Sequence, residues 1–581
     1  MAEKKLGTFE INPAKNPAVL DTLTWDTPAL LRRLQAQSQD FWRSTRLNLC
    51  SGKPLPEAHG LRLYEHSRGQ SDKRSFVLLE DQQGQCAVAE FTPSENQPSV
   101  PDPLLRRELE PGESVFFHEA NAKTLHSIYG RAAPEKVPQA LAMTPRLGIG
   151  TRMSQAMWPG IWQALREGSF SANAFQNSLR ELNLLENIRE RRAGNKLYYP
   201  GIGFVPEGHT GSTFEGLWLS GVVGGLKAGV TRPYGADADH IMVKRGVDGL
   251  ERAKRVLTAA RYYSFFTIDV SDILDYAAFP GAGSGKASVE LLQQRIGDAG
   301  TRKEVLAYYR KPLKIGGRSY RLGESELSAL VGKYWQAMEA MDVLIPFIQG
   351  MRGNEPFDLE LSIDEHPPEI HPFDCLTVEL EVAFILNEMK RRGKRLSHIA
   401  PNLGVEKHVD YRYRDGLEGL EARTRALHRL ANEEEVVIDC HSGDDLSSST
   451  RRALKRATGG LLNFKVSPFP QTLFADVLYA FDRDFFRIWW EDTYAFAQEN
   501  ATEGSVFAAE CLKQFDTDPA AAPHPRYSLF RIYCYATVGK RDERGDYLYR
   551  ERFYALSPEF YAEYTRQLKS YLCLLADDLL P

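Results

Sequence analysis

One short stretch, Val436 to Asp445, constrains the fold more than any other. Its first three residues are β-branched and predict a buried strand, which Gly443 brings to an end. Carboxylate and imidazole side chains are concentrated at that end, at Asp439, His441, Asp444 and Asp445. Parallel sheets present catalytic groups at the carboxyl ends of their strands, so this stretch indicates an α/β enzyme.

The same pattern recurs from about residue 140, where short strands alternate with amphipathic helices. Eight strands are predicted, beginning at Arg146, Asn173, Gly235, Ser264, Asp358, Leu396, Val436 and Leu462. Eight strands that are each followed by a helix predict a TIM-like (β/α)8 barrel, with a doubly wound open sheet as the alternative. Residues 275–355 are too many for one simple connection and must carry extra helices.

The 581 residues are enough for two or three domains. We predict an N-terminal α/β domain over residues 1–135, which includes a hairpin from Ser75 to Phe91. The catalytic barrel is predicted over residues 140–480. We predict that residues 481–581 form a helical segment that packs on the barrel.

Composition excludes several classes of function. The net charge of −5 gives no broad attraction to nucleic acid or to anionic membranes. The longest apolar stretch, Leu217 to Val230, is interrupted by Lys227 and is too short to span a bilayer. Seven cysteines without a CxxC pair indicate a reducing compartment, and the first residues contain no apolar signal region. We therefore expect a cytoplasmic protein with a small-molecule substrate, whose oligomeric state the sequence does not predict.

In a barrel, the carboxyl ends of all strands surround one mouth, so residues far apart in sequence converge there. A single Asp after a strand is more often a helix cap than a ligand. Two histidines at the ends of different strands, His240 and His441, favour a divalent cation such as Zn, Mn, Ni, Fe or Co. The candidates are Asp237, Asp239, His240, Asp269, Asp364, Glu365, His398, Asp439, His441, Asp444, Asp445 and Lys465.

Each of the other candidate residues has a purely structural interpretation as well as a functional one. His398 lies early in its strand and fits the barrel wall or a substrate contact better than a metal site. Glu406 follows the sixth strand and is either an oxygen ligand or a surface charge. Lys465 is a cation on a buried strand that suits a substrate carboxylate or, less well, a Schiff base. Cys440 points away from the face of His441 and fits core packing. The segment 280–287 lacks two residues of a phosphate loop.

With these residues assembled, the barrel portion resembles the tagaturonate/fructuronate epimerase family, which interconverts two ketohexuronates that are epimeric at one carbon. The matching segments span about residues 145–470 and are 235–240, 266–272, 362–365, 406–411, 441–444 and 457–460. The resemblance implies a divalent metal held by His240, Glu406 and His441. It implies Asp239 as proton acceptor and Glu365 as proton donor. Further substrate contacts are expected from Lys465, Asp269 and Asp444.

Such residues fit an epimerase of hexuronate (galacturonate and glucuronate) catabolism. A cation stabilises a developing oxyanion, and two carboxyl groups act on opposite faces of a carbon. The inverting carbon is β to the ketone, so two routes stay open: proton removal at carbon, or retro-aldol cleavage and re-addition. The alternative functions are a metal-dependent sugar-acid aldolase or lyase and a non-catalytic sugar-acid-binding protein.

Overall fold

The computed structural model describes residues 25–110, 112–192, 194–199, 203–279, 289–365, 370–406 and 409–581. It also gives the backbone of two short strands, β1 (Lys4–Leu6) and β2 (Phe9–Ile11). The glycine-rich segment 280–287, which the sequence excludes as a phosphate loop, lies outside the described residues.

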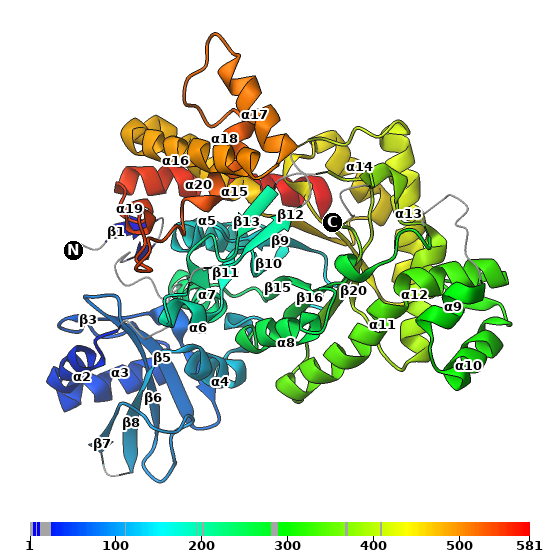
Figure 1. Cartoon of the computed structure of the whole chain (residues 1–581). Coiled ribbons are helices and arrows are strands. Elements are labelled where there is room, and N and C mark those ends of the chain that lie inside the picture. The colour runs from blue at the N-terminus through cyan, green and yellow to red at the C-terminus, as the bar shows by residue number, and fades with distance from the viewer. Residues whose placement is uncertain are drawn as a thin grey trace.

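The centre of the molecule is a closed barrel of eight parallel strands (Figure 1). This confirms the predicted (β/α)8 fold and excludes the open sheet. Each strand falls at a predicted position: β9 (Arg146–Gly150), β10 (Ser171–Asn177), β15 (Gly235–Met242), β16 (Phe265–Asp269), β19 (Asp358–Ser362), β20 (His398–Ala400), β21 (Val437–Cys440) and β22 (Leu462–Val466). They are hydrogen-bonded in that order, and β22 closes the barrel on β9.

The junction of β22 and β9 shows how the barrel interior accommodates polar side chains. Gly148 of β9 lies opposite Lys465 of β22. A Cβ atom on Gly148 would lie 2.0 Å from the Oε1 of Gln176 and 3.0 Å from the Cγ of Lys465. Only glycine therefore leaves room for these two long side chains inside the barrel.

Helices cover the outside of the barrel and bury the apolar stretches of the sequence. The main ones are α5 (Ser154–Glu167), α7 (Phe214–Ala228), α8 (Gly249–Ala259), α11 (Glu324–Arg352), α12 (Glu379–Arg391), α13 (Gly416–Glu433), α14 (Ser448–Thr458) and α15 (Pro468–Phe481). Almost every residue of α7 is buried, which accounts for its high apolar content. No helix among the described residues is long and apolar enough to cross a membrane.

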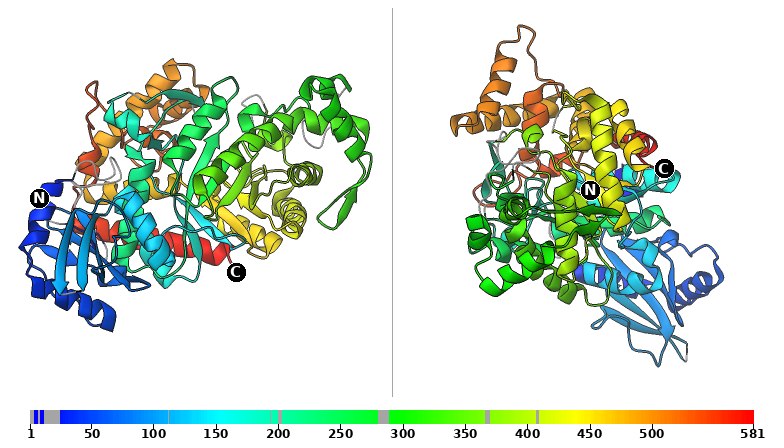
Figure 2. Two further views of the ribbon diagram at one scale, coloured as in Figure 1. Left: turned by 90° about the horizontal axis from the view of Figure 1, so that it is seen from below. Right: turned by 90° about the vertical axis from the view of Figure 1, so that its right-hand side faces the viewer.

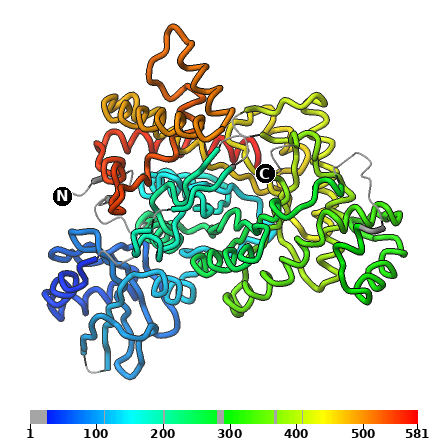
Figure 3. The backbone as a smooth tube through the Cα atoms, in the orientation of Figure 1, coloured from blue at the N-terminus to red at the C-terminus, as the bar shows by residue number. Residues whose placement is uncertain are grey.

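Two long connections interrupt the simple alternation. Between β10 and α7 the chain forms the short elements α6 (Leu185–Arg189), β11 (Leu182–Asn183), β12 (Lys196–Tyr199), β13 (Gly203–Pro206) and β14 (Ser212–Thr213). Between β16 and β19 it adds α9 (Val289–Arg295), α10 (Ala299–Tyr309) and the hairpin β17 (Leu313–Ile315) to β18 (Arg318–Tyr320) before α11. The second connection contains the extra helices expected there. Figure 3 shows it in green, at the opposite end of the molecule from the blue N-terminal domain.

The N-terminal part is a separate α/β unit set beside the barrel (Figure 2). Its sheet has the order β3-β5-β6-β8-β7, with β4 beside β5. The predicted hairpin is β5 (Arg74–Asp81) and β6 (Cys86–Pro93), and the sequence did not reveal β3 (Leu61–Leu63), β4 (Gly69–Ser71) or β7 (Leu105–Glu110). The remaining elements are β8 (Glu113–Glu119), α2 (Thr27–Ala36), α3 (Gln39–Ser51) and α4 (Ala122–Ala132). Lys227 of α7 pairs with Glu80 of β5 and joins this unit to the barrel.

The C-terminal residues form helices rich in aromatic side chains. They are α16 (Arg483–Thr502), α17 (Val506–Asp516), α18 (Ser528–Tyr533), α19 (Arg550–Phe553) and α20 (Pro558–Leu579). Trp489 packs edge-on against Phe530 and Phe553 at ring distances of 5.2 and 4.8 Å. The helix α20 lies against α5, α14 and α15, so the end of the chain covers the outside of the barrel.

Candidate active site

The predicted acidic residues and histidines gather at the carboxyl-terminal mouth of the barrel. Strand β15 supplies Asp237, Asp239 and His240, all buried. His240 has a φ of 42°, a left-handed backbone conformation that is uncommon outside glycine. This local strain changes the course of the strand just where its polar side chains point into the mouth.

Lys465 is at the centre of the acidic cluster. Its Nζ lies 3.0 Å from Asp237 Oδ2, 3.0 Å from Asp239 Oδ1 and 2.7 Å from Glu360 Oε2. It also donates to the Oγ1 of Thr267 at 2.8 Å. Burial alone lowers the pKa of this ammonium, but the surrounding carboxylates outweigh it and raise the pKa well above its ordinary value. Lys465 is therefore a charged lysine held by the protein, which disfavours a Schiff base.

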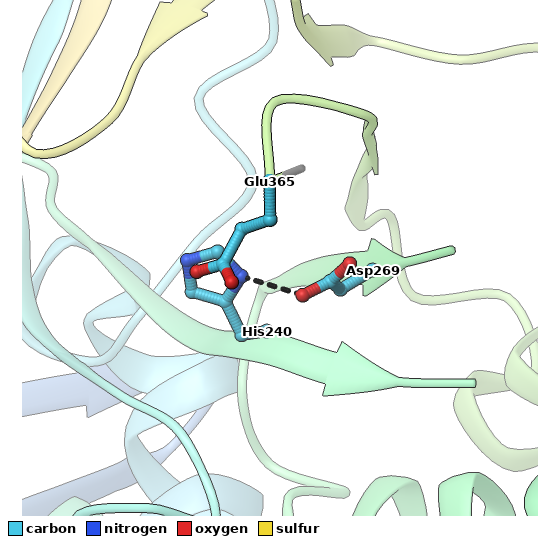
Figure 4. A group of neighbouring side chains, drawn as sticks. All are labelled: His240, Asp269 and Glu365. Carbon is cyan, nitrogen blue, oxygen red and sulfur yellow. Dashed lines mark hydrogen bonds and ion pairs between the residues drawn. The ribbon is translucent and has the colours of Figure 1, made fainter. Parts of the chain in front are cut away.

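His240 faces two carboxyl groups from other strands (Figure 4). Its Nδ1 lies 3.0 Å from the Oδ2 of Asp269, at the end of β16. Glu365, on the loop after β19, points its carboxyl group toward the same imidazole. One donor atom from each of the three residues lies within 4.8 Å of the others. Asp239 approaches the other ring nitrogen, with its Oδ2 4.0 Å from His240 Nε2.

His441 lies next to His240, with 5.0 Å between the ring centroids. Its Nε2 is 2.8 Å from Glu360 Oε1 and its Nδ1 is 3.1 Å from Asp364 Oδ2. Neither nitrogen has the angles of a hydrogen bond to a described residue, although both are buried. Glu360, Asp439 and His441 form a second group whose donor atoms lie within 4.8 Å of one another.

Comparison with known proteins decides the family. The family model described as tagaturonate epimerase, UxaE, matches residues 207–503, just over half of the chain. This chain belongs to that family. A curated relative, the tagaturonate/fructuronate epimerase of Thermotoga maritima, is 24% identical over 70% of this chain and 74% of its own length.

Solved structures of fructuronate-tagaturonate epimerase UxaE from Cohnella laeviribosi share the fold. The complex with one glycerol has a TM-score of 0.61 to this chain at 19% sequence identity, and the match covers 93% of this chain and 99% of the Cohnella chain. The native structure has a TM-score of 0.59 at 18% identity and the same coverage. The family match covers β15 to β22 and therefore contains every candidate residue of the mouth.

The carboxyl groups at the mouth differ in how readily they ionise. Burial raises the pKa of Asp237 to about 7, and burial together with Glu360 raises the pKa of Asp439 well above its ordinary value. For Asp239, burial also raises the pKa, but the positive charges of Lys465 and the two histidines outweigh it and lower the pKa overall. Asp239 is therefore the ionised partner, and Asp237 and Asp439 hold protons more readily.

The residues at the mouth fit a divalent cation. Burial lowers the pKa of His441, but Asp364 and Glu360 raise it well above its ordinary value, and Asp239 and Asp269 raise the pKa of His240 against burial. The carboxylates around each imidazole thus stabilise positive charge there. A bound cation would supply that charge in place of a proton on the imidazole. The close approach of Glu360 to His441 without hydrogen-bond geometry also suits ligands of a shared ion.

Glu406, the third predicted ligand, is differently placed. Both of its carboxylate oxygens accept from Arg412, at 2.7 and 2.8 Å. It belongs to neither cation-competent group found among the described residues. Its role as a ligand stays a prediction, and the structure brings carboxylates from β16, β19 and β21 to the two histidines.

The three predicted substrate contacts are all engaged with the protein. Lys465 is surrounded by carboxylates, and Asp269 accepts from His240 and from the backbone of Ser271. Asp444 accepts from the backbone N–H groups of residues 467 and 469 at the start of α15, and burial raises its pKa to about 6. These contacts give each residue a structural role, and direct contact with the substrate stays a prediction.

The remaining candidates are structural. His398 is fully buried, packs edge-on against Phe265 at 4.7 Å, and burial lowers its pKa well below the ordinary value, as suits the barrel wall. Cys440 is buried, and burial raises the pKa of its thiol, in line with core packing. Asp445 pairs with Arg531 of α18 at 3.0 Å.

Sequence reasoning missed two residues of the mouth. Glu360 lies between Leu359 and Leu361 on β19 and contacts His441. A carboxylate between two apolar strand residues could have identified it as a functional residue. Arg180, after β10, lies 3.5 Å from Glu365 Oε1. No local pattern marked it, because it lies in an irregular connection that only the fold brings to the mouth.

Proposed function

We propose that this protein is an epimerase that interconverts D-tagaturonate and D-fructuronate in hexuronate catabolism. Membership of the tagaturonate epimerase family supports the reaction. The observation that carries the proposal is that Asp239 of β15 and Glu365 of the loop after β19 both border the imidazole of His240. A hydroxyketone edge bound beside this imidazole would lie within reach of both carboxyl groups.

Asp239 is the proton acceptor in this proposal. Its Oδ1 lies 3.0 Å from Lys465, and its Oδ2 accepts from Gln176 at 3.3 Å, so its orientation is fixed. The lowered pKa keeps it ionised at neutral pH, as a base must be. The depressed pKa also makes it a weak base, so the substrate proton that it takes must itself be acidified in the site.

Glu365 is the proton donor. Its side chain is 25% exposed, on a loop rather than in the barrel wall, so it exchanges protons with solvent more readily than Asp239 does. Its backbone carbonyl accepts from the hydroxyl of Tyr276 at 2.6 Å, which anchors the backbone at this residue. An exposed acid and a buried base on the two sides of one substrate suit an inversion at carbon.

A divalent metal is part of the proposal. His240 and His441 would hold it, with carboxylate ligands drawn from Asp269 or from Glu360 and Asp439, and with Glu406 as the third ligand that the family resemblance implies. When bound, such a cation polarises the oxygens of a hydroxyketone and stabilises negative charge on them. The identity of the metal is open among Zn, Mn, Ni, Fe and Co, all of which accept imidazole and carboxylate ligands.

Two chemical routes use the same pair of carboxyl groups. In the first, Asp239 removes the proton from the inverting carbon, and Glu365 returns a proton to the opposite face. In the second, Asp239 takes the hydroxyl proton as the bond between the inverting carbon and its neighbour next to the ketone breaks. The resulting aldehyde turns, and the carboxyl pair returns a proton to its oxygen as the bond reforms. We favour the second, because a C–H that is β to a ketone is not acidified by enolisation.

The test is incubation of the purified, metal-supplemented protein with tagaturonate, followed by chromatography. Fructuronate should accumulate to an equilibrium that is also reached from the fructuronate side. Two shorter fragments in place of the epimer would indicate an aldolase or lyase, and the absence of any turnover would refute the proposal. A cytoplasmic location belongs to the proposal too, and fractionation of cells that produce the protein would test it.

A further inference from the structure

The mouth of the barrel is strongly acidic, although the proposed substrate is itself an anion. Among the residues that the structure describes, seven carboxyl groups gather there: Asp237, Asp239, Asp269, Glu360, Asp364, Glu365 and Asp439. Lys465 is already surrounded by three of them. The positive groups at this floor are already paired with carboxylates, so we expect the substrate carboxylate's partner in another part of the mouth.

Two arginines supply positive charge on the side of β9 and β10. Arg152, just after β9, donates to Ser467 Oγ at 3.0 Å and to Glu181 Oε1 at 3.1 Å. Glu181 is buried, and despite burial its pKa is held well below the ordinary value by His209 and the two arginines. Arg152 is therefore compensated by a carboxylate of the protein and fixed at two points.

Arg180 is held differently. Its Nε donates to Ser178 Oγ at 3.3 Å, which holds one edge of the guanidinium. Its Nη1 lies 3.5 Å from Glu365 Oε1, a looser contact than a direct charge-assisted hydrogen bond. The side chain is 17% exposed, so it is largely shielded from solvent but not fully buried.

The position of Arg180 matches the shape of a ketohexuronate. The substrate is a six-carbon chain with the carboxylate at one end and the ketone next to the other end. The inverting carbon lies two bonds from the ketone carbon and two bonds from the carboxylate carbon. A group that binds the carboxylate must therefore adjoin the acid and base themselves, as Arg180 adjoins Glu365.

We propose that Arg180 forms the carboxylate-binding subsite and selects ketouronates over neutral ketohexoses. The inference rests on the proposed function for the identity of the substrate. The planar guanidinium presents two parallel N–H groups to a carboxylate, which a lysine ammonium does not. Binding would turn the Nη end of Arg180 from Glu365 toward the substrate and leave the Glu365 carboxyl group available to donate its proton.

The experiment compares wild type, Arg180→Gln and Arg180→Lys, with Arg245→Gln as the matched control. Arg245 lies on the loop after β15 at the same end of the barrel, is exposed, and donates to the backbone carbonyls of residues 272 and 274. Calorimetry measures binding of galactonate, an unreactive six-carbon acid, and of galactitol, its neutral counterpart. Steady-state kinetics with tagaturonate gives kcat and KM separately, and thermal unfolding checks that each variant is folded.

Arg180→Gln should weaken galactonate binding by about 10- to 100-fold and raise KM for tagaturonate by a similar factor. Galactitol binding should change by less than about 2-fold, because it has no carboxylate. Arg180→Lys should recover part of the loss through its charge alone. Arg245→Gln should resemble wild type in every measurement.

Unchanged galactonate affinity in a folded Arg180→Gln variant would overturn the subsite. A drop confined to kcat would also overturn it, because it would show that Arg180 only positions Glu365. The proposed function is tested apart from this: wild-type protein that binds galactonate through Arg180 but does not epimerise tagaturonate would refute the reaction and leave the subsite standing.

Discussion

The ammonium of Lys465 lies 3.0 Å from the Oδ1 of Asp239, across the interior of the barrel. The two residues belong to β22 and β15, which are separated in the barrel by β9 and β10. Gly148 of β9 leaves the space through which the lysine side chain reaches its partners. This contact fixes the proposed base and offsets part of the negative charge that the mouth accumulates.

Replacing Lys465 by Met should destabilise the protein by about 3 kcal/mol or more. The change removes the buried positive charge that Asp237, Asp239 and Glu360 share. Urea denaturation at pH 7 measures the effect. Lys254→Met is the control: this lysine pairs with Glu251 on the surface of α8, so its loss should cost at most about 0.5 kcal/mol. Equal denaturation midpoints for the two variants would contradict the prediction.

The carboxyl pair should be required for turnover but not for metal. Asp239→Asn and Glu365→Gln should each lower kcat by roughly 100-fold or more, the usual size for loss of a general acid or base. Elemental analysis of the same preparations should find the metal content of wild type. A variant with wild-type kcat would remove that residue from the mechanism. Metal loss in Asp239→Asn would make it a ligand instead of a base.

His240→Ala and His441→Ala should each lose both bound metal and activity. Their rings lie 5.0 Å apart at the mouth, where substitution disturbs the barrel core little. We expect about one divalent cation per chain in wild type, and activity that chelators abolish and added metal restores. Full activity in excess chelator, with no metal by elemental analysis, would contradict the metal proposal.

Isotope labelling separates the two chemical routes. Epimerisation in deuterated water should leave the inverting carbon with its own hydrogen, because in the retro-aldol route that carbon passes through an aldehyde. Deuterium could enter at the neighbouring carbon, which becomes part of an enediolate. Mass spectrometry and NMR of the isolated product locate the label. One deuterium at the inverting carbon of each converted molecule would establish proton removal at carbon by the carboxyl pair.

Glu215 should make stability depend on pH. It lies in the first turn of α7, where burial raises its pKa to about 7 and its Oε2 has no hydrogen-bond partner among the described residues. The folded state then binds a proton that the unfolded state releases near pH 4.5, so stability falls as the pH rises from about 4.5 to about 7.

Glu215→Gln removes that cost and should stabilise the protein on the order of 1 kcal/mol or more at pH 8. At pH 4.5 the two proteins should differ little, because the carboxyl group is protonated in the folded state. Denaturation at both pH values provides the measurement. A stabilisation of equal size at both pH values would show that titration of Glu215 is not the cause.

Much of the architecture was predictable because strand signals are local. Strand β21 begins with the β-branched residues Val437 and Ile438, and polar groups follow at once, so the strand and its catalytic end can be read within ten positions. Parallel strands share one edge, which places His240 and His441 near each other without knowledge of the side-chain packing. The short antiparallel strands of the N-terminal sheet were harder to predict from the sequence, because β3 and β4 have only three residues each.

The sequence by itself determined the alternation of strands and helices, the count of eight strands, and which residue types end each strand. Tertiary structure alone decided which of those residues meet. Glu406 pairs with Arg412, Lys465 turns to carboxylates of its own chain, and Arg180 reaches Glu365 from an irregular connection. The physical reason is that strand periodicity fixes only the face on which a side chain lies. Which partner a side chain meets depends on its length and on the space that other strands leave. Gly148, for example, leaves the space that Lys465 occupies.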